Sequence, residues 1–180
     1  MRVLLDANVL YPTVMREVLL GCASRGLFSP RWSARVLEEW ARAAARIDPA
    51  QEVVARGEIA LVEAAFPEAS VRYPAEKERQ FWLPDAADIH VLTAAVAGHC
   101  DAICTMNAKD FPKNLLAEEG LERLDPDGFL LSLHARAPEA VAGIGAGVLA
   151  QARALSGEDW TMRKLMKKAR LPRLGKALEA

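Results

Sequence analysis

Val3-Leu4-Leu5-Asp6-Ala7-Asn8-Val9-Leu10 is the stretch of sequence that decides the fold. Arg2 to Leu5 is a short aliphatic run, which is typical of a buried strand in a parallel sheet. Asp6 ends this run, and apolar residues then recur at helical spacing after Pro12, a residue suited to a first helical turn. In open α/β sheets, ligands bind beyond the carboxyl ends of the strands. The stretch therefore predicts an α/β fold with a functional role for Asp6, the alternative being that Asp6 or Asn8 only caps the next helix.

Strand-like and helix-like segments alternate over the first part of the chain. We expect further strands at residues 26–30, 101–105 and 121–124, and an irregular segment at 66–80. Helices are expected after Ser33, from Pro49, after Asp85, from Asn114 and after Asp125. This alternation predicts a parallel sheet with helices on both faces.

Composition and charge restrict the class of protein. A chain of 180 residues fits one domain with a small appendage, and a hydrophobic content of 52% supports a sizeable core. The formal net charge is −1, so the chain lacks the global basic character of a simple nucleic-acid-binding module. The three cysteines lack metal-type spacing and read as reduced thiols, and neither a signal peptide nor a membrane span is expected. These features predict a cytoplasmic protein.

The chain from residue 134 onward is expected to be a helical extension of a domain formed by residues 1–133. Ser156 to Asp159 has the pattern of a helix cap, and Pro172 is expected to end the helix that follows. That helix has an apolar stripe and a basic surface formed by Arg163, Lys164, Lys167 and Lys168. The basic residues could contact RNA phosphates, bind a partner protein, or remain solvated on a helix that packs against the core.

Two pairs of acidic residues lie on predicted helices. Glu39 borders the apolar face of its helix, whereas Glu38 points nearly the opposite way, toward solvent. Asp85 is a good N-cap, and Asp88 lies on the same side of the helix start. Because a second acid adds little to capping, Asp88 is the better candidate for a metal ligand.

A further carboxylate, Asp110, follows the strand at residues 101–105. Thr105, Asn107 and Asp110 could each face the end of this strand, or the last two could serve only in a turn. A parallel sheet would bring Asp6, Asp88 and Asp110 to one edge, where their repulsion requires a divalent cation. Oxygen ligands of this kind select Mg²⁺ or Mn²⁺ over Zn²⁺, and such an ion activates water and polarises phosphoryl oxygens. The predicted reaction is therefore phosphodiester hydrolysis.

At these residues the chain resembles the PIN-domain nucleases, especially the VapC-like toxins of bacterial toxin–antitoxin pairs. The matching segments are Leu5 to Leu10, Trp32-Ser33 with Leu37 to Trp40, Asp85 to Asp88 with Leu92, Ala94 and Ala95, and Ile103 to Phe111. The resemblance implies a three-layer α/β/α sandwich with a parallel sheet, and a Mg²⁺- or Mn²⁺-dependent ribonuclease. It also implies RNA as the substrate, an antitoxin protein as a partner, and a homodimer.

The resemblance assigns roles to individual residues. The implied metal ligands are Asp6, Glu39 and Asp88, and the implied supporting residues are Asn8, Thr105 and Asn107. Asn107 departs from the family pattern, because the fourth acid usually lies two residues after the threonine. Asp110 is expected to supply the missing charge as a catalytic residue. If it does not, the site has one charge fewer and holds its metal more weakly.

Three functions remain open. The first is a metal-dependent endoribonuclease that acts as a toxin. The second is a non-catalytic PIN-like interaction protein, which Asn107 would explain. The third is a Mg²⁺-dependent phosphatase with Asp6 as nucleophile; it ranks last because that class normally has a second acid at the position of Asn8.

Other conspicuous residues are interpreted as structural. Trp32, Trp40, Trp82 and Trp160 are expected to be packing residues rather than a platform for stacked bases. His90 has no metal-ligand spacing to another histidine and is expected on the surface or in the core, and Cys104 is expected in a buried strand.

Overall fold

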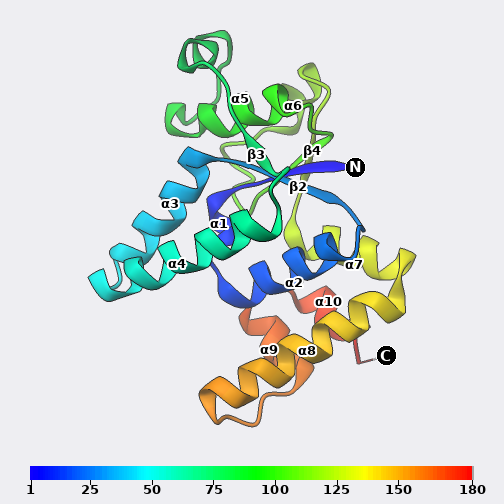
Figure 1. Ribbon diagram of the computed structural model, residues 1–180. Helices are drawn as coiled ribbons and strands as arrows, with labels where there is room; N and C mark the ends of the chain where they lie inside the picture. Colours follow the sequence, from blue (N-terminus) through cyan, green and yellow to red (C-terminus); the bar gives the residue numbers. More distant parts are fainter. Residues whose placement is uncertain (180) are drawn as a thin grey trace. The chain divides into compact units, whose positions relative to one another are not determined.

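The computed structural model describes residues 1–179, which form two compact units (Figure 1). The first unit contains residues 1–11 and 29–124, and it holds all the strands among the described residues. The second contains residues 12–28 and the chain from residue 125 onward, and its regular elements are all helices. The predicted division of the chain at residue 134 stays a prediction.

A parallel five-stranded sheet forms the centre of the first unit. Its strands are β1 (Arg2–Leu5), β2 (Ser29–Ser33), β3 (Ser70–Val71), β4 (Ala102–Cys104) and β5 (Glu122–Leu124). They lie in the order β3-β2-β1-β4-β5, and every neighbouring pair is parallel. Val3, Leu4 and Leu5 of the central strand have no exposed surface. The predicted α/β fold with a parallel central sheet is confirmed.

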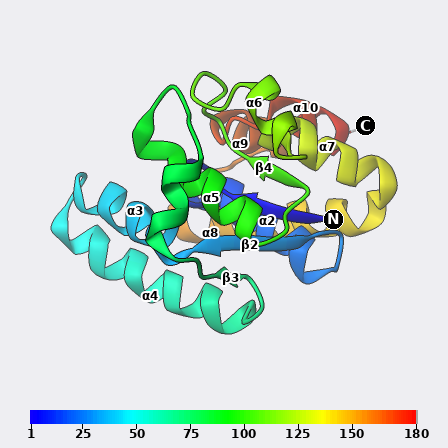
Figure 2. The same ribbon diagram turned by 90° about the horizontal axis from the view of Figure 1, so that it is seen from above.

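Helices flank this sheet. They are α1 (Ala7–Leu10), α3 (Ala34–Ala45), α4 (Pro49–Ala65), α5 (Ile89–Ala97) and α6 (Lys113–Glu118), with the 3₁₀ helices η1 (Ala75–Gln80) and η2 (Ala86–Asp88). Helix α5 contacts β1, β2 and β4, and α3 packs against α4 (Figure 2). Residues 90–95 of α5 are all buried, which explains why the sequence of this helix is apolar almost all round.

Helix caps explain where several of these elements begin. The Ser33 hydroxyl accepts a hydrogen bond from the Val36 amide at 3.3 Å and so starts α3, as predicted. Asp48 accepts from the Ala50 amide at 2.9 Å, with Pro49 in the first turn of α4. Ordinary capping chemistry therefore sets the position of α3, the helix that carries Glu39.

As far as residue 179, the second unit packs five helices, α2 (Thr13–Ser24), α7 (Pro126–Arg136), α8 (Pro138–Ser156), α9 (Met162–Lys168) and α10 (Pro172–Ala177). Helix α2 contacts α7 and α8, and α10 contacts α7 and α9. The buried carboxylate of Asp127 accepts hydrogen bonds from the backbone amides of Arg173 and Leu174, each at 3.0 Å. It thereby ties α7 to the start of α10.

Several expected elements differ from the observed ones. The second strand begins at Ser29 rather than residue 26, because Gly26 turns with a φ of +72° and pairing with β1 starts at Ser29. The segment expected to be irregular contains β3 and η1, since β3 is created by pairing with β2 and not by its own sequence. These differences arise from contacts that local patterns do not report.

The C-terminal helices also begin and end differently. Ser156 is the last residue of α8 and does not cap the next helix; Thr161 does, by accepting from the Lys164 amide at 3.3 Å. Pro172 begins α10 rather than ending the helix before it. A proline is tolerated in the first turn of a helix because the N–H groups there have no partner within the helix. The interpretation of Trp82 as a packing residue is wrong, because it is 67% exposed. Among residues 1–179, no helix has the length and apolar character required to cross a bilayer.

Candidate metal centre

The candidate site lies where the strand order of the sheet reverses. The chain builds β1, β2 and β3 toward one edge and then crosses to the other side of β1 to form β4. The ends of β1 and β4 therefore flank the switch point, which is the usual ligand position in open α/β sheets. Asp6 follows β1, and its amide donates to the carbonyl of Cys104, the last residue of β4. Asp6 and Thr105 thus emerge side by side.

The Asp6 carboxylate is held on both oxygens. Its Oδ1 accepts from the Ala7 amide at 2.7 Å, so Asp6 does cap α1 as the structural alternative required. Its Oδ2 accepts from Asn8 Nδ2 at 2.6 Å and from the Thr105 hydroxyl at 2.7 Å. Capping and a site role are therefore compatible, since different oxygens serve them. The side chain is only 5% exposed, and these donors fix its orientation.

Asn8 also ties β1 to the loop after β4. Its Nδ2 lies 3.0 Å from the Thr105 hydroxyl oxygen, and its Oδ1 accepts from the Met106 amide at 3.0 Å. The Thr105 oxygen in turn accepts from the Asn107 amide at 2.9 Å. This network orders the loop that carries the remaining polar residues of the site.

Asn107 lies between the two other aspartates of the prediction. Its Nδ2 donates to Asp88 Oδ2 at 3.1 Å, and its Oδ1 accepts from the Asp110 amide at 3.4 Å. Asp88 is the N-cap residue of α5 but its side chain makes no capping hydrogen bond, in keeping with the view that this carboxylate is not needed for capping. The side-chain amide of Asn107, at the position of the family's usual fourth acid, therefore donates a hydrogen bond to the Asp88 carboxylate.

Asp85, Asp88 and Asp110 form a group of possible metal ligands within the described part of the chain. One carboxylate oxygen from each lies within 4.8 Å of the others. Asp85 caps η2 as predicted, with its Oδ1 accepting from the Ala87 amide at 2.9 Å. Its place in this group was missed, although its spacing of three residues from Asp88 indicated that both face the same side.

The acids influence one another electrostatically. Burial raises the pKa of Asp88 to about 6, with further contributions from the negative charges of Asp6, Asp85, Asp110 and Glu39. Burial also raises the pKa of Asp6, against the hydrogen bond from Thr105, and the charge of Glu39 adds to the rise. Neighbouring carboxylates disfavour each other's ionised forms. The ionised form of Asp88 is therefore disfavoured by burial first and by four neighbouring acids second.

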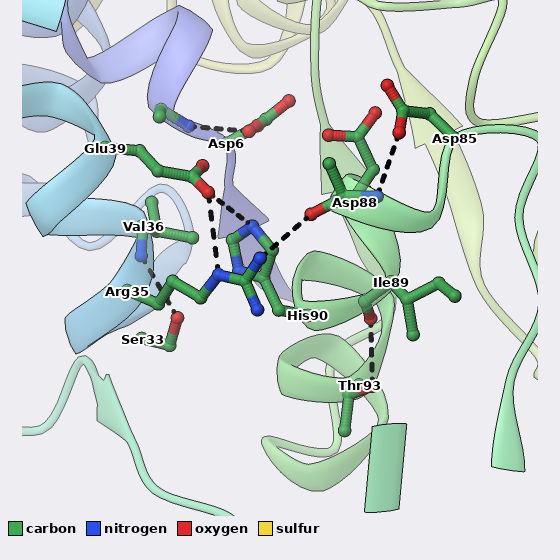
Figure 3. Close-up of polar contacts among 12 residues, drawn as sticks. Asp6, Ser33, Arg35, Val36, Glu39, Asp85, Asp88, Ile89, His90 and Thr93 are labelled. Carbon is green, nitrogen blue, oxygen red and sulfur yellow. Dashed lines mark hydrogen bonds and ion pairs between the residues drawn. The ribbon is translucent and has the colours of Figure 1, made fainter. Parts of the chain in front are cut away.

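Glu39 approaches this site from α3 (Figure 3). Its Oε1 lies 2.8 Å from His90 Nε2 and 3.7 Å from Arg35 Nε. Asp6, Glu39 and Asp88 extend from three different elements toward a common space in Figure 3. Glu38 instead pairs with Arg42 and Arg56, at 3.1 and 2.9 Å. The two glutamates therefore have different partners, although Glu38 is not the more solvent-exposed of the two, as its predicted direction required: the side chains are 36% and 35% exposed.

The donor set suits a hard divalent cation. The acids that surround the space offer only carboxylate oxygens, which favour Mg²⁺ or Mn²⁺. A cation placed there would favour the ionised form of Asp88, against the burial and the neighbouring charges that raise its pKa. Asp88 lies in one group with Asp85 and Asp110, which could share such an ion, whereas Asp6 and Glu39 of the predicted ligand set lie outside that group. The basic residues Arg163, Lys164, Lys167 and Lys168 are exposed on α9, in the other unit.

A parallel α/β sheet with clustered carboxylates at its switch point offers a ligand site whose oxygen donors suit a hard divalent cation. The family model described as PIN domain matches residues 2–109, and the chain belongs to the PIN-domain family. PIN domains are generally nucleases and typically use divalent metals, so membership indicates a nuclease. The chain gives no significant match to a curated protein or to a solved structure.

Proposed function

We propose that this chain is a Mg²⁺- or Mn²⁺-dependent endoribonuclease and the toxin of a type II toxin–antitoxin pair. The observation that carries the proposal is the convergence of carboxylates on Asp88, whose pKa they help to raise to about 6. Like charges gathered in a partly buried site are costly unless a cation offsets them. The match to the PIN-domain family supports the same chemistry.

Each polar residue of the centre has a distinct task in this proposal. Asp6, Glu39 and Asp88 bind the ion. Asp110 adds the negative charge that an acid at position 107 would otherwise supply. Asn8 and Thr105 hold the Asp6 carboxylate in one orientation through short hydrogen bonds. The ion, when bound, would activate a water molecule and polarise the phosphodiester. Preorganised ligands of this kind avoid reorganisation during the reaction.

The partners follow from the proposed role. RNA is the substrate, and the exposed basic side chains of α9 are candidates for phosphate contacts or for contacts with an antitoxin. A homodimer and a cytoplasmic location belong to the same proposal.

RNA cleavage with Mg²⁺ or Mn²⁺ tests the proposal. Asp6→Asn and Asp88→Asn should each abolish cleavage, because each removes a ligand charge while it keeps the shape of the side chain. Glu38→Gln is a matched control, since this neighbouring acid is committed to Arg42 and Arg56. Equal activity of the wild-type protein and both aspartate variants would refute a role for the acidic centre in cleavage.

A catalytically inactive PIN-like interaction protein is the second candidate, and Asn107 is the observation that favours it. Titration with Mn²⁺ separates the two: absence of binding, together with retention of a protein partner, would favour the inactive form. A phosphatase fits less well, because Asn8 donates to Asp6 and leaves no second acid at that position. A phosphorylated Asp6 would be the result that supports it.

A further inference from the structure

We propose that His90 is a positioning residue that sets the orientation of the Glu39 carboxylate in the metal centre. This inference rests on the proposed function and adds a residue to which neither the sequence nor the family match gave a role. His90 lies in α5, two residues after Asp88, and its Nε2 is 2.8 Å from Glu39 Oε1 (Figure 3).

The surroundings of His90 set it apart from an ordinary core residue. Its side chain has no exposed surface, yet neither ring nitrogen makes a hydrogen bond of standard geometry within residues 1–179. Glu39 Oε1 is nevertheless 2.8 Å from Nε2, close enough for a charge-assisted contact when the imidazole carries a proton there. Leaving a buried polar group unsatisfied is costly, and an apolar side chain could fill the same space. A histidine here is therefore explained better by its contact with Glu39 than by packing.

A set of polar contacts holds both sides of this pair. Arg35 lies 3.7 Å from Glu39 and 3.4 Å from the Glu78 carboxylate, and it also approaches the Ala87 carbonyl at 3.4 Å. The Tyr73 hydroxyl lies 3.0 Å from the same Glu78 carboxylate and 3.2 Å from the His90 carbonyl oxygen.

These contacts link α3, η1 and α5 around the pair. They connect α3 to α5 close to the point where the imidazole meets Glu39. Groups that orient metal ligands commonly change metal affinity or activity by about 10- to 100-fold when they are removed.

The experiment measures Mn²⁺ affinity of the full chain without RNA, from the spectrum of free Mn²⁺ in electron paramagnetic resonance. His90→Met removes the imidazole nitrogens and keeps an apolar side chain, and it should weaken binding by about 10-fold or more. His90→Gln restores an N–H donor at a similar reach and should recover most of the affinity. The melting temperature of His90→Met should equal or exceed that of the wild-type protein, because an unsatisfied polar group leaves the core.

A double-mutant cycle shows whether His90 acts through Glu39. In a Glu39→Gln background, His90→Met should cause no further loss of Mn²⁺ affinity. Thr93→Val is the matched control, because Thr93 is buried in the same helix and bonds only the Ile89 carbonyl, at 2.9 Å. Wild-type affinity in His90→Met, or additive losses in the double variant, would overturn the inference alone. Absence of Mn²⁺ binding by the wild-type protein would overturn the proposed metal centre as well.

Discussion

Asp88→Asn should stabilise the metal-free protein at neutral pH while it destroys the metal centre. The carboxylate of Asp88 is partly buried and faces the negative charges of four other acids. An asparagine has nearly the same shape, and its Oδ1 can still accept the hydrogen bond that Asn107 Nδ2 donates to Asp88. The substitution therefore removes repulsion without creating a cavity.

The magnitude follows from the pKa of Asp88, which rises from 3.8 to about 6. At about 1.4 kcal/mol for each step of one in pKa, this rise corresponds to about 3 kcal/mol. The site is partly open to solvent, which screens the charges, so we expect a gain of about 1–2 kcal/mol.

The pH dependence has a defined sign. Because the pKa is higher in the folded protein than in the unfolded chain, the folded protein binds more protons between about pH 4 and pH 6. The free energy of unfolding of the metal-free wild-type protein should therefore fall as the pH rises through this window. The advantage of Asp88→Asn should be complete above pH 7 and should vanish below about pH 4.

Urea denaturation at pH 3.5 and pH 7.5, with a chelator present, measures this difference. Glu68→Gln serves as a control, because Glu68 is an exposed acid outside the centre and its loss should change stability by less than about 0.5 kcal/mol. Added Mn²⁺ should raise the melting temperature of the wild-type protein but not that of Asp88→Asn. A variant that is no more stable than the wild-type protein at pH 7.5 would refute the reasoning, since burial and the neighbouring charges would then not disfavour the ionised form of Asp88.

Three further predictions concern other parts of the structure. Asn107→Asp should tighten Mn²⁺ binding and lower the stability of the metal-free protein by about 1–3 kcal/mol, because the amide that donates to Asp88 is replaced by a negative charge. Calorimetric titration measures the binding and urea denaturation the stability; weaker Mn²⁺ binding would contradict the prediction. Trp32→Ala should lower the free energy of unfolding by about 3–5 kcal/mol, because this indole is fully buried beside Phe66, whereas Trp82→Ala should lower it by less than about 0.5 kcal/mol, because Trp82 is 67% exposed. Similar losses for the two variants in urea denaturation would be inconsistent with the fold. Asp127→Ala should lower the free energy of unfolding by about 1–3 kcal/mol, because the Arg173 and Leu174 amides lose their acceptor. Mn²⁺ affinity should not change; a loss of affinity would show that the effect of the substitution is not confined to the helical unit.

The sequence predicts most of the framework of the site. Strands were expected at or near four of the five observed ones, although the expected second strand overlaps β2 only at Ser29 and Pro30. The fifth, β3, consists of Ser70 and Val71 and exists through pairing with β2, so its own sequence carries no strand signal. The position of Asp6 at the end of β1 followed from the strand alone, since parallel sheets place such residues at the ligand-binding edge.

The details of the site depend on contacts between distant segments. Asp85 was separated from the ligand candidates because capping explained it, but the fold also brings Asp110 within reach of it. The contact between His90 and Glu39 joins residues 51 positions apart and leaves no periodic trace in the sequence. Side-chain convergence of this kind is decided by tertiary packing, which local patterns do not encode.

The position of Mn²⁺ in crystals of the wild-type protein tests the central claim most directly. Anomalous scattering locates the ion without reference to activity or to an RNA substrate. We expect one strong peak at the ends of β1 and β4, at about 2.0–2.3 Å from carboxylate oxygens that include those of Asp6 and Asp88. A protein saturated with Mn²⁺ that shows no peak there, or a peak only on acids elsewhere, would contradict the account.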